Sequence, residues 1–255
     1  MHKRHQRILR ILKEQGAVNV NALSEQLGVS PVTVRRDLDA LDKRHIIERT
    51  HGGAILTDFD GTEFTFHQKS TMNILEKSAI GKTAAGIAKD GDVLLLNSGS
   101  TTLEIVKNLV RRDVQIVTNS GATIHLMQNA TAQLFLIGGE YRQASKSFIG
   151  ELAHQGLNQF YSTLTVLGIN GIDVEHGLTS SVLQEAAVNK IMIERTRGSV
   201  VVVADHTKLG KVSNFMTAPI TRINTLITDD QCDQQFVEAL EQLGINVIIA
   251  AEDAI

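Results

Sequence analysis

Apolar residues recur with a helical period near the start of the chain. Between residues 7 and 13 they share one face while basic residues occupy the others, which predicts a helix that ends at Gly16. Val18 and Val20 then alternate with polar neighbours, as in a short strand. A second helix is expected over 21–27, with a glycine after it. This pattern predicts a small, helix-rich unit.

A third helix is predicted to begin at Ser30 and Pro31, because serine is favoured as an N-cap and proline at the first helical position. At about 100° per residue, Val34, Leu38 and Leu41 form one stripe suited to packing. The N-terminal half then exposes Val32, Thr33, Arg35 and Arg36. An exposed charged pair is commonly only a solvated face, but side chains at this place in a recognition helix meet the major groove of DNA.

A β-hairpin is expected over 46–56, where two apolar-rich stretches flank Gly52-Gly53, a pair able to adopt the positive φ of a tight turn. A hairpin directly after a recognition helix is typical of a wing. Arg49 and His51 lie near its tip and are candidates for contact with phosphates or the minor groove. For His51, a hydrogen bond within the turn is an equally good interpretation.

The pattern changes after residue 56. Residues 57–75 are polar and turn-prone but include three phenylalanines, which indicates a partly packed connector. From residue 76 onward, continuous apolar runs alternate with helical patterns and predict an α/β domain with a mainly parallel sheet. The expected strands are 93–96, 114–117, 134–137, 164–167, 200–204, 226–227 and 247–249. The expected helices are 76–89, 102–110, 122–129, 151–160, 184–196 and 233–243. The predicted domains are therefore 1–56 and 76–255.

Composition and charge narrow the function. Hydrophobic residues make up 42% and charged residues 21%, as in an ordinary globular protein. A single cysteine, no apolar run of membrane-spanning length and no signal-peptide pattern together predict a cytoplasmic protein that does not enter membranes. The net charge is −3, yet residues 1–56 contain ten Lys/Arg against six Asp/Glu. A basic head on an acidic body favours contact between the head and nucleic acid.

Small and polar residues follow the predicted strands, where parallel sheets bind ligands. Residues 98–102 place hydroxyls and a glycine before a helix N-terminus, which can hold an anion or can simply be a capped turn. Asn119, Gly139, Asn170 and Lys208 come after later strands. Together they predict a site for a hydroxylated, phosphorylated small molecule, with no metal and no cofactor.

The N-terminal motifs resemble the DNA-binding domain of the DeoR family of bacterial transcriptional regulators. The resemblance rests on Gly16-x-Val18-x-Val20, Val29-Ser30-x2-Thr33-Val34-Arg35-Arg36-Asp37-Leu38 and Arg49-Thr50-His51-Gly52-Gly53-Ala54, in order. It implies a winged helix-turn-helix that binds double-stranded operator DNA. The implied DNA-binding residues are Ser30, Val32, Thr33, Arg35, Arg36, Arg49 and His51. His45 stands where the family usually has glycine, so the recognition helix is expected to end differently.

The remainder resembles the DeoR effector domain, whose fold is similar to ribose-5-phosphate isomerase. The motifs are Gly99-Ser100-Thr101-Thr102, Thr118-Asn119-Ser120, Gly138-Gly139, Gly168-x-Asn170-Gly171-Ile172, Glu185 with Lys190, and Asp205-x2-Lys208-x-Gly210. The resemblance implies a sugar-phosphate effector, with the phosphate at the 98–102 loop and Lys208. The implied effector-binding residues are Ser98, Gly99, Ser100, Thr101, Thr102, Asn119, Gly139, Asn170, Glu185 and Lys208. Asn97 replaces the aspartate of many members and removes a carboxylate.

Three functions fit the sequence to different degrees. A DNA-binding regulator that senses a sugar phosphate is favoured, and a homo-oligomer on paired half-sites is expected because one head makes few base contacts. An architectural DNA binder would not need polar, glycine-rich loops at so many strand ends. An isomerase needs a general base, for which Glu185, Asp173 and Asp205 are the candidates. The sequence therefore predicts a regulator, most simply a repressor of a carbohydrate operon, with no catalytic residues.

Overall fold

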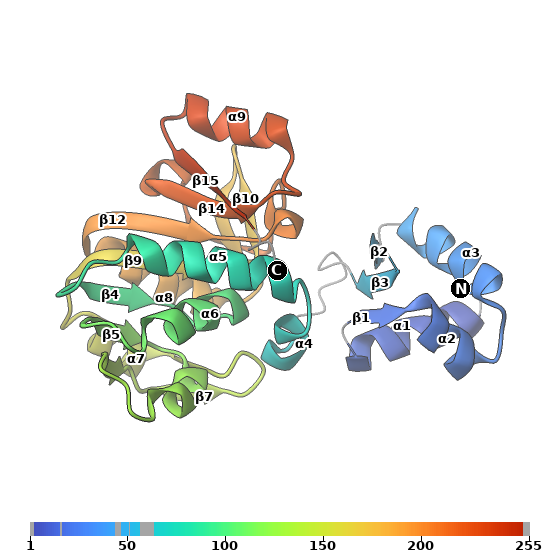
Figure 1. The fold of residues 1–255 in the computed structure, drawn as a ribbon, viewed down its shortest axis with the longest axis horizontal. Coiled ribbons are helices and arrows are strands. Elements are labelled where there is room, and N and C mark those ends of the chain that lie inside the picture. The colour runs from blue at the N-terminus through green and yellow to red at the C-terminus, as the bar shows by residue number, and fades with distance from the viewer. Residues whose placement is uncertain (1–2, 16, 44–46, 51, 57–63, 252–255) are drawn as a thin grey trace. The chain divides into compact units, whose positions relative to one another are not determined.

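The computed structural model describes residues 3–15, 17–43, 47–50, 52–56 and 64–251, and Figure 1 draws its helices and strands. Contacts divide the chain into two compact units, residues 1–72 and 73–255. Each unit is described by itself. Three sequence predictions fall outside the described residues. They are the helix end at Gly16, the effect of His45 on the end of the recognition helix, and the DNA contact by His51.

The first unit combines three helices with a small antiparallel sheet. Its order is α1 (Lys3–Gln15), β1 (Ala17–Asn19), α2 (Val20–Leu27), α3 (Pro31–Asp42), β2 (Ile47–Thr50) and β3 (Gly53–Leu56), followed by α4 (Phe66–Ser70). The strands pair in the order β1-β3-β2. This is a helix-turn-helix with a two-stranded wing, as predicted. The short helix α4 lies in the stretch expected to be a connector.

The caps of α2 and the buried face of α3 agree with the sequence pattern of the first unit. Asn19 caps α2, since its side chain accepts a hydrogen bond from the backbone N–H of Ala22 at 2.8 Å. Gly28 ends the same helix in the left-handed conformation, with φ of 67°. The predicted packing stripe of α3 is fully buried. It joins a core cluster of Ile8, Leu12, Leu23, Val34, Leu38, Leu41 and Ile47.

A seven-stranded parallel sheet forms the centre of the second unit. Its spatial order is β15-β14-β12-β9-β4-β5-β6. The strands are β4 (Val93–Leu96), β5 (Gln115–Thr118), β6 (Gln133–Leu136), β9 (Ser162–Gly168), β12 (Thr196–Val203), β14 (Thr225–Asp229) and β15 (Asn246–Ala250). All seven predicted strands are confirmed. The inner strands have almost continuous buried residues because both faces of the sheet are covered there, whereas β6 and β15 at the two ends of the sheet are only partly buried.

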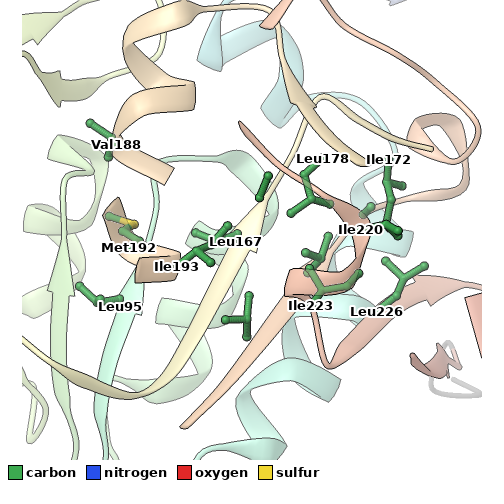
Figure 2. Close-up of a cluster of buried hydrophobic side chains, with 14 of the residues drawn as sticks. Leu95, Leu167, Ile172, Leu178, Val188, Met192, Ile193, Ile220, Ile223 and Leu226 are labelled. Carbon is green, nitrogen blue, oxygen red and sulfur yellow. The ribbon is translucent and has the colours of Figure 1, made fainter. Parts of the chain in front are cut away.

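Helices cover the sheet on both faces (Figure 1). They are α5 (Ile74–Ile87), α6 (Ser100–Leu109), α7 (Glu151–Leu157), α8 (Leu183–Glu194) and α9 (Gln234–Gln242). One core cluster packs α5 and α6, through residues such as Ile80 and Ile105, against one side of the strands. The other packs α7 and α8 against the opposite side, and Figure 2 shows Val188, Met192 and Ile193 of α8 within it.

Several elements differ from the sequence prediction. The helix expected over 122–129 is a 3₁₀ helix, η2 (Gly121–Met127), in whose first turn the Thr123 hydroxyl donates to the carbonyl of the N-cap residue Ser120 at 2.7 Å. Such local bonds compete with an α-helical ladder. A hairpin of β7 (Glu140–Arg142) and β8 (Ser147–Ile149) was not predicted. Neither was a small antiparallel sheet of β10 (Gly171–Asp173), β11 (Gly177–Ser180) and β13 (Phe215–Ala218).

Candidate functional site

Helix α3 presents the predicted set of side chains around its buried stripe. Arg35 and Arg36 are exposed, and the apolar side chain of Val32 is 65% exposed beside them. Ser30 acts as the N-cap, accepting from the backbone N–H of Thr33 at 3.3 Å, and the two hydroxyls lie 2.9 Å apart. The exposed half of α3 therefore offers two cations, two hydroxyls and one aliphatic group.

A buried carboxylate on α3 was not singled out from the sequence. Asp37 Oδ1 accepts a hydrogen bond from Arg4 Nη2 at 2.8 Å and lies 3.2 Å from His5 Nε2, while Arg4 Nε donates to Asp37 Oδ2. The hydrogen bonding from Arg4 holds the pKa of Asp37 below its ordinary value. This network ties α1 to α3 on the side away from the exposed arginines. Its only signal in the sequence is an acidic residue beside a hydrophobic stripe.

Arg49 of β2 contacts the recognition helix. Its Nε lies 3.6 Å from Asp39 Oδ1, while its Nη1 is buried with no hydrogen-bond partner among the described residues. Gly53 lets the wing approach β1 closely, since a Cβ there would lie 2.1 Å from the Val18 carbonyl oxygen. Arg49 thus links wing and helix as well as lying in the predicted DNA-binding set.

In the second unit, Asn97 joins two neighbouring strand ends. Its Nδ2 donates to the Gly168 carbonyl at 2.7 Å and to Asn189 Oδ1 at 3.0 Å, and its Oδ1 accepts from the Gly168 N–H at 2.9 Å. All of these atoms lie at the carboxyl ends of β4 and β9 or on α8. The amide is therefore used fully within the protein, and both its donor and its acceptor are needed.

The loop after β4 is also held by hydrogen bonds within the protein. The Ser98 N–H donates to Asn119 Oδ1 at 3.0 Å, and the Ser98 hydroxyl donates to the Ser145 carbonyl at 2.9 Å. Asn119 also donates to the Phe148 carbonyl at 2.9 Å. Thr102 Oγ1 donates to the Asn97 carbonyl at 2.8 Å. The structure thus brings Ser98, Asn119 and the β7–β8 hairpin together at one edge of the sheet.

The N-terminus of α6 is the part of this edge suited to an anion. Gly99 is its N-cap residue and has no side chain with which to satisfy the first backbone N–H groups. Ser100 and Thr101 are buried in the first turn. Positive partial charge at a helix N-terminus favours an anion there.

Two further predicted residues have structural partners. Asn170 Oδ1 accepts from the Ser180 hydroxyl at 3.2 Å and from the Ser181 N–H at 3.3 Å, which closes the turn after β9. Gly139 was expected to let a ligand approach, but it has a φ of +153°, and a Cβ there would lie 2.5 Å from the Ile149 carbonyl oxygen. Glycine at this position is required by the packing of the hairpin itself.

Lys208 belongs to a short 3₁₀ helix, η3 (His206–Lys208), that follows β12 and begins at Asp205. Asp205 is buried and accepts from the Thr207 N–H at 3.2 Å, so it caps this turn. Burial alone would raise the pKa of Asp205, but the charges of Lys208 and Lys77 outweigh it and hold the pKa below its ordinary value. Two cations therefore lie in the field of one buried carboxylate.

Glu185 lies in the first turn of α8 and meets a residue that the sequence did not indicate. Its Oε1 is 3.6 Å from Arg142 Nη1 at the end of β7, and that oxygen is buried with no hydrogen-bond partner among the described residues. Arg142 Nη1 donates to Ser145 Oγ at 3.2 Å. The cation nearest to this carboxylate is therefore Arg142 of the β7–β8 hairpin, so the five-residue spacing between Glu185 and Lys190 does not decide its ion pairing.

The described part of the chain contains no group of three or more His, Cys, Asp or Glu side chains arranged to hold a metal ion. Within the same residues, no helix is both long and apolar enough to cross a membrane.

Known proteins match this chain along almost its whole length. The family model of a DeoR-like helix-turn-helix domain matches residues 4–59, and that of the DeoR C terminal sensor domain matches residues 72–230. The transcriptional regulator GlpR of Haloferax volcanii is 34% identical over 96% of this chain and 96% of its own length. The lactose phosphotransferase system repressor of Lactococcus lactis is 30% identical over 94% of this chain and 95% of its own. Ribose 5-phosphate isomerase A of Methanocaldococcus jannaschii, 18% identical, aligns with 52% of this chain and 53% of its own, with a TM-score of 0.39.

Proposed function

The chain belongs to the DeoR family of transcriptional regulators, and on that premise we propose that it is a sequence-specific repressor of a carbohydrate-utilisation operon whose operator binding is controlled by a sugar phosphate. The observation that supports this most directly is that the two units carry different kinds of candidate site. The first exposes Arg35, Arg36 and Val32 on a recognition helix. The second places an anion-suited helix N-terminus among polar strand ends.

The DNA contacts follow from the chemistry of α3. Arginine binds the O6 and N7 acceptors of guanine or a phosphate, and an aliphatic group such as Val32 contacts the methyl group of thymine. Arg49 and His51 of the wing are proposed to contact the backbone. One head reads few bases, so we propose that a homo-oligomer binds paired half-sites of a double-stranded operator.

The effector is proposed to bind at the carboxyl edge of the parallel sheet. Its phosphate would meet the first turn of α6 (Gly99, Ser100, Thr101) and the cation of Lys208. Control of DNA binding then requires that the sugar phosphate bind one arrangement of the protein more tightly than another.

Two of the three candidate carboxylates near this edge are already engaged within the protein, which supports a binding role over catalysis. Asp205 caps η3 and lies in the field of two lysines. Asp173 Oδ1 accepts from the N–H and ring Nδ1 of His176, each at 2.8 Å. A general base for isomerisation must instead be placed to remove a proton from the substrate. We propose that the ligand is released unchanged.

The test combines gel-shift titration with ligand binding. Arg35→Ala and Arg36→Ala should each weaken operator binding by about 1–3 kcal/mol if the arginine reads a base. Arg111→Ala, which removes the same charge from the second unit, should leave affinity unchanged. The sugar phosphate that stabilises the protein in a thermal-shift screen should lower operator affinity and show no conversion by NMR. Unchanged operator affinity of both α3 variants, or conversion of the ligand in proportion to protein, would overturn the proposal.

A further inference from the structure

Hydrogen bonds join the turn that carries Lys208 to the beginning of α5. The backbone N–H of His206, the first residue of η3, donates to Asp229 Oδ2 at 2.8 Å, and the ring Nδ1 of His206 lies 2.9 Å from Asp229 Oδ1. Asp229 Oδ1 also accepts from the Gln231 N–H at 3.1 Å. The Gln231 side chain then donates to Glu76 Oε1, in the first turn of α5, at 3.0 Å. A continuous set of hydrogen bonds therefore runs from η3 to α5.

Buried charges form a second link between the same two elements. Lys77 of α5 is buried, as is Asp205 directly after β12, and α5 packs against both β12 and β14. The charges of Lys77 and Lys208 together hold the pKa of Asp205 below its ordinary value. One buried carboxylate is thus shared between a cation of the proposed phosphate site and a cation of α5.

Apolar packing contributes little to the first turn of α5. Ile74 and Leu75 are 56% and 65% exposed, so their side chains bury little apolar area. Asn73, the N-cap residue, has a φ of 49°, and its side chain makes no cap hydrogen bond with the described residues. Asparagine adopts this left-handed region at lower cost than most residues. The polar contacts of Glu76 and Lys77 therefore have a large share in positioning the turn.

This turn also lies at the junction of the two units. The boundary between them falls between residues 72 and 73, directly before α5. α4, the last helix of the first unit, ends at Ser70, so residues 71–73 join the two helices. A change in the first turn of α5 is therefore passed along the chain to the unit that carries the recognition helix.

Resting on the proposed function, we propose that η3 and the first turn of α5 form the element that couples effector binding to operator release. A phosphate held by Lys208 competes with Asp205 for that cation, and the buried carboxylate then depends more on Lys77. The state with effector bound accordingly favours a different placement of the first turn of α5 from the state without it. Coupling between two sites requires such a difference between two states of the protein.

The experiment measures operator affinity of the full-length protein by gel-shift titration, with and without a saturating sugar phosphate. The ligand is whichever of ribose 5-phosphate, glucose 6-phosphate and fructose 1-phosphate stabilises the wild type most in a thermal-shift assay. The ratio of the two operator Kd values is the coupling factor, for which about 5–150 is typical of allosteric proteins. In Lys77→Met this factor should fall to about two or less, while the operator Kd without ligand stays within about twofold of wild type. Lys82→Met removes an exposed lysine from the same helix and should keep the wild-type factor.

Gln231→Ala tests the hydrogen-bonded link without removing a buried charge. Because Gln231 is exposed, the variant should fold, and loss of one hydrogen bond should lower the coupling factor by about threefold. Gln235→Ala is the matched control, since Gln235 is also exposed and its backbone N–H donates to Asp233 Oδ1 at 2.9 Å. It should leave the coupling factor unchanged.

Reciprocity distinguishes lost coupling from damaged binding. The calorimetric Kd of the sugar phosphate with and without operator DNA must change by the same factor as the operator Kd. A wild-type factor in Lys77→Met would overturn the inference and leave the proposed function standing. Where that variant does not fold or does not bind the ligand, a wild-type factor in Gln231→Ala would do so. A wild type whose operator affinity none of the sugar phosphates changes would overturn the proposed function, and the inference with it.

Discussion

Replacement of Asn97 by aspartate tests how the carboxyl ends of the parallel strands are held together. The amide Nδ2 donates two hydrogen bonds, to the Gly168 carbonyl and to Asn189 Oδ1. A carboxylate of the same shape has no donor, so both acceptors would face a negative oxygen in a buried site. An unsatisfied buried polar group costs about 1–3 kcal/mol. Asn97→Asp should therefore lower the free energy of unfolding by about 2–4 kcal/mol at neutral pH.

The loss should depend on pH in a defined direction. Burial and two facing oxygens raise the pKa of the introduced carboxyl group, because the neutral acid can still donate one hydrogen bond. A group whose pKa is raised in the folded protein destabilises it increasingly as pH rises above the pKa in the unfolded chain. The deficit of Asn97→Asp against wild type should accordingly be smaller at about pH 5 than at about pH 8.

Urea unfolding of the full chain, followed by circular dichroism at both pH values, provides the measurement. Asn108→Asp is the matched control, since its amide also donates to a backbone carbonyl, at 2.8 Å, but at an exposed site. It should cost less than about 0.5 kcal/mol at either pH. Equal deficits for the two variants, or a deficit at position 97 that shrinks at higher pH, would refute the reasoning.

Two further predictions concern the turn after β12. Lys208→Ala should abolish release of operator DNA by the sugar phosphate that the wild type binds, with unchanged DNA affinity in a gel shift, whereas exposed Lys211→Ala should respond normally. The hydrogen bond with Asp229, at 2.9 Å, raises the pKa of His206 above its ordinary value of 6.5. The charged His206 therefore stabilises the folded protein fully below pH 6.5, and this stabilisation is lost as pH rises through its raised pKa. The thermal midpoint of His206→Gln should accordingly lie furthest below that of the wild type near about pH 6, and least far below it near about pH 9. A gap independent of pH would contradict this assignment.

The parallel sheet could be predicted from sequence because its strands are long apolar runs. Val93–Leu96, for example, was predicted with the bounds that the structure gives it, since a strand covered on both faces has no polar residues to obscure it. The strands β10, β11 and β13 are only three or four residues long, and β11 pairs with a strand far along the chain at Leu178 and Ala218. No periodicity of useful length marks such elements.

The sequence predicted which side chains of the candidate sites are exposed or buried better than it predicted which residues they contact. The wheel of α3 placed Val34 inside and Arg36 outside correctly because a regular helix fixes both directions. Partners across the fold follow no such rule. Arg142 looks like a surface residue of an irregular stretch, and only the β7–β8 hairpin, packed against α8, brings it to Glu185.

The polar residues at the carboxyl edge of the sheet fall into two groups with different consequences. Asn97, Ser98 and Asn119 make hydrogen bonds within the protein and join neighbouring strand ends. The buried oxygen of Glu185 has no hydrogen-bond partner in the described residues. Changes in the first group should lower the unliganded thermal midpoint, because they break existing bonds. Changes in the second break no hydrogen bond of the described residues and should lower that midpoint less. Polar residues after a strand thus point to a candidate ligand site, and their hydrogen-bond partners in the fold show which of them are already engaged within the protein.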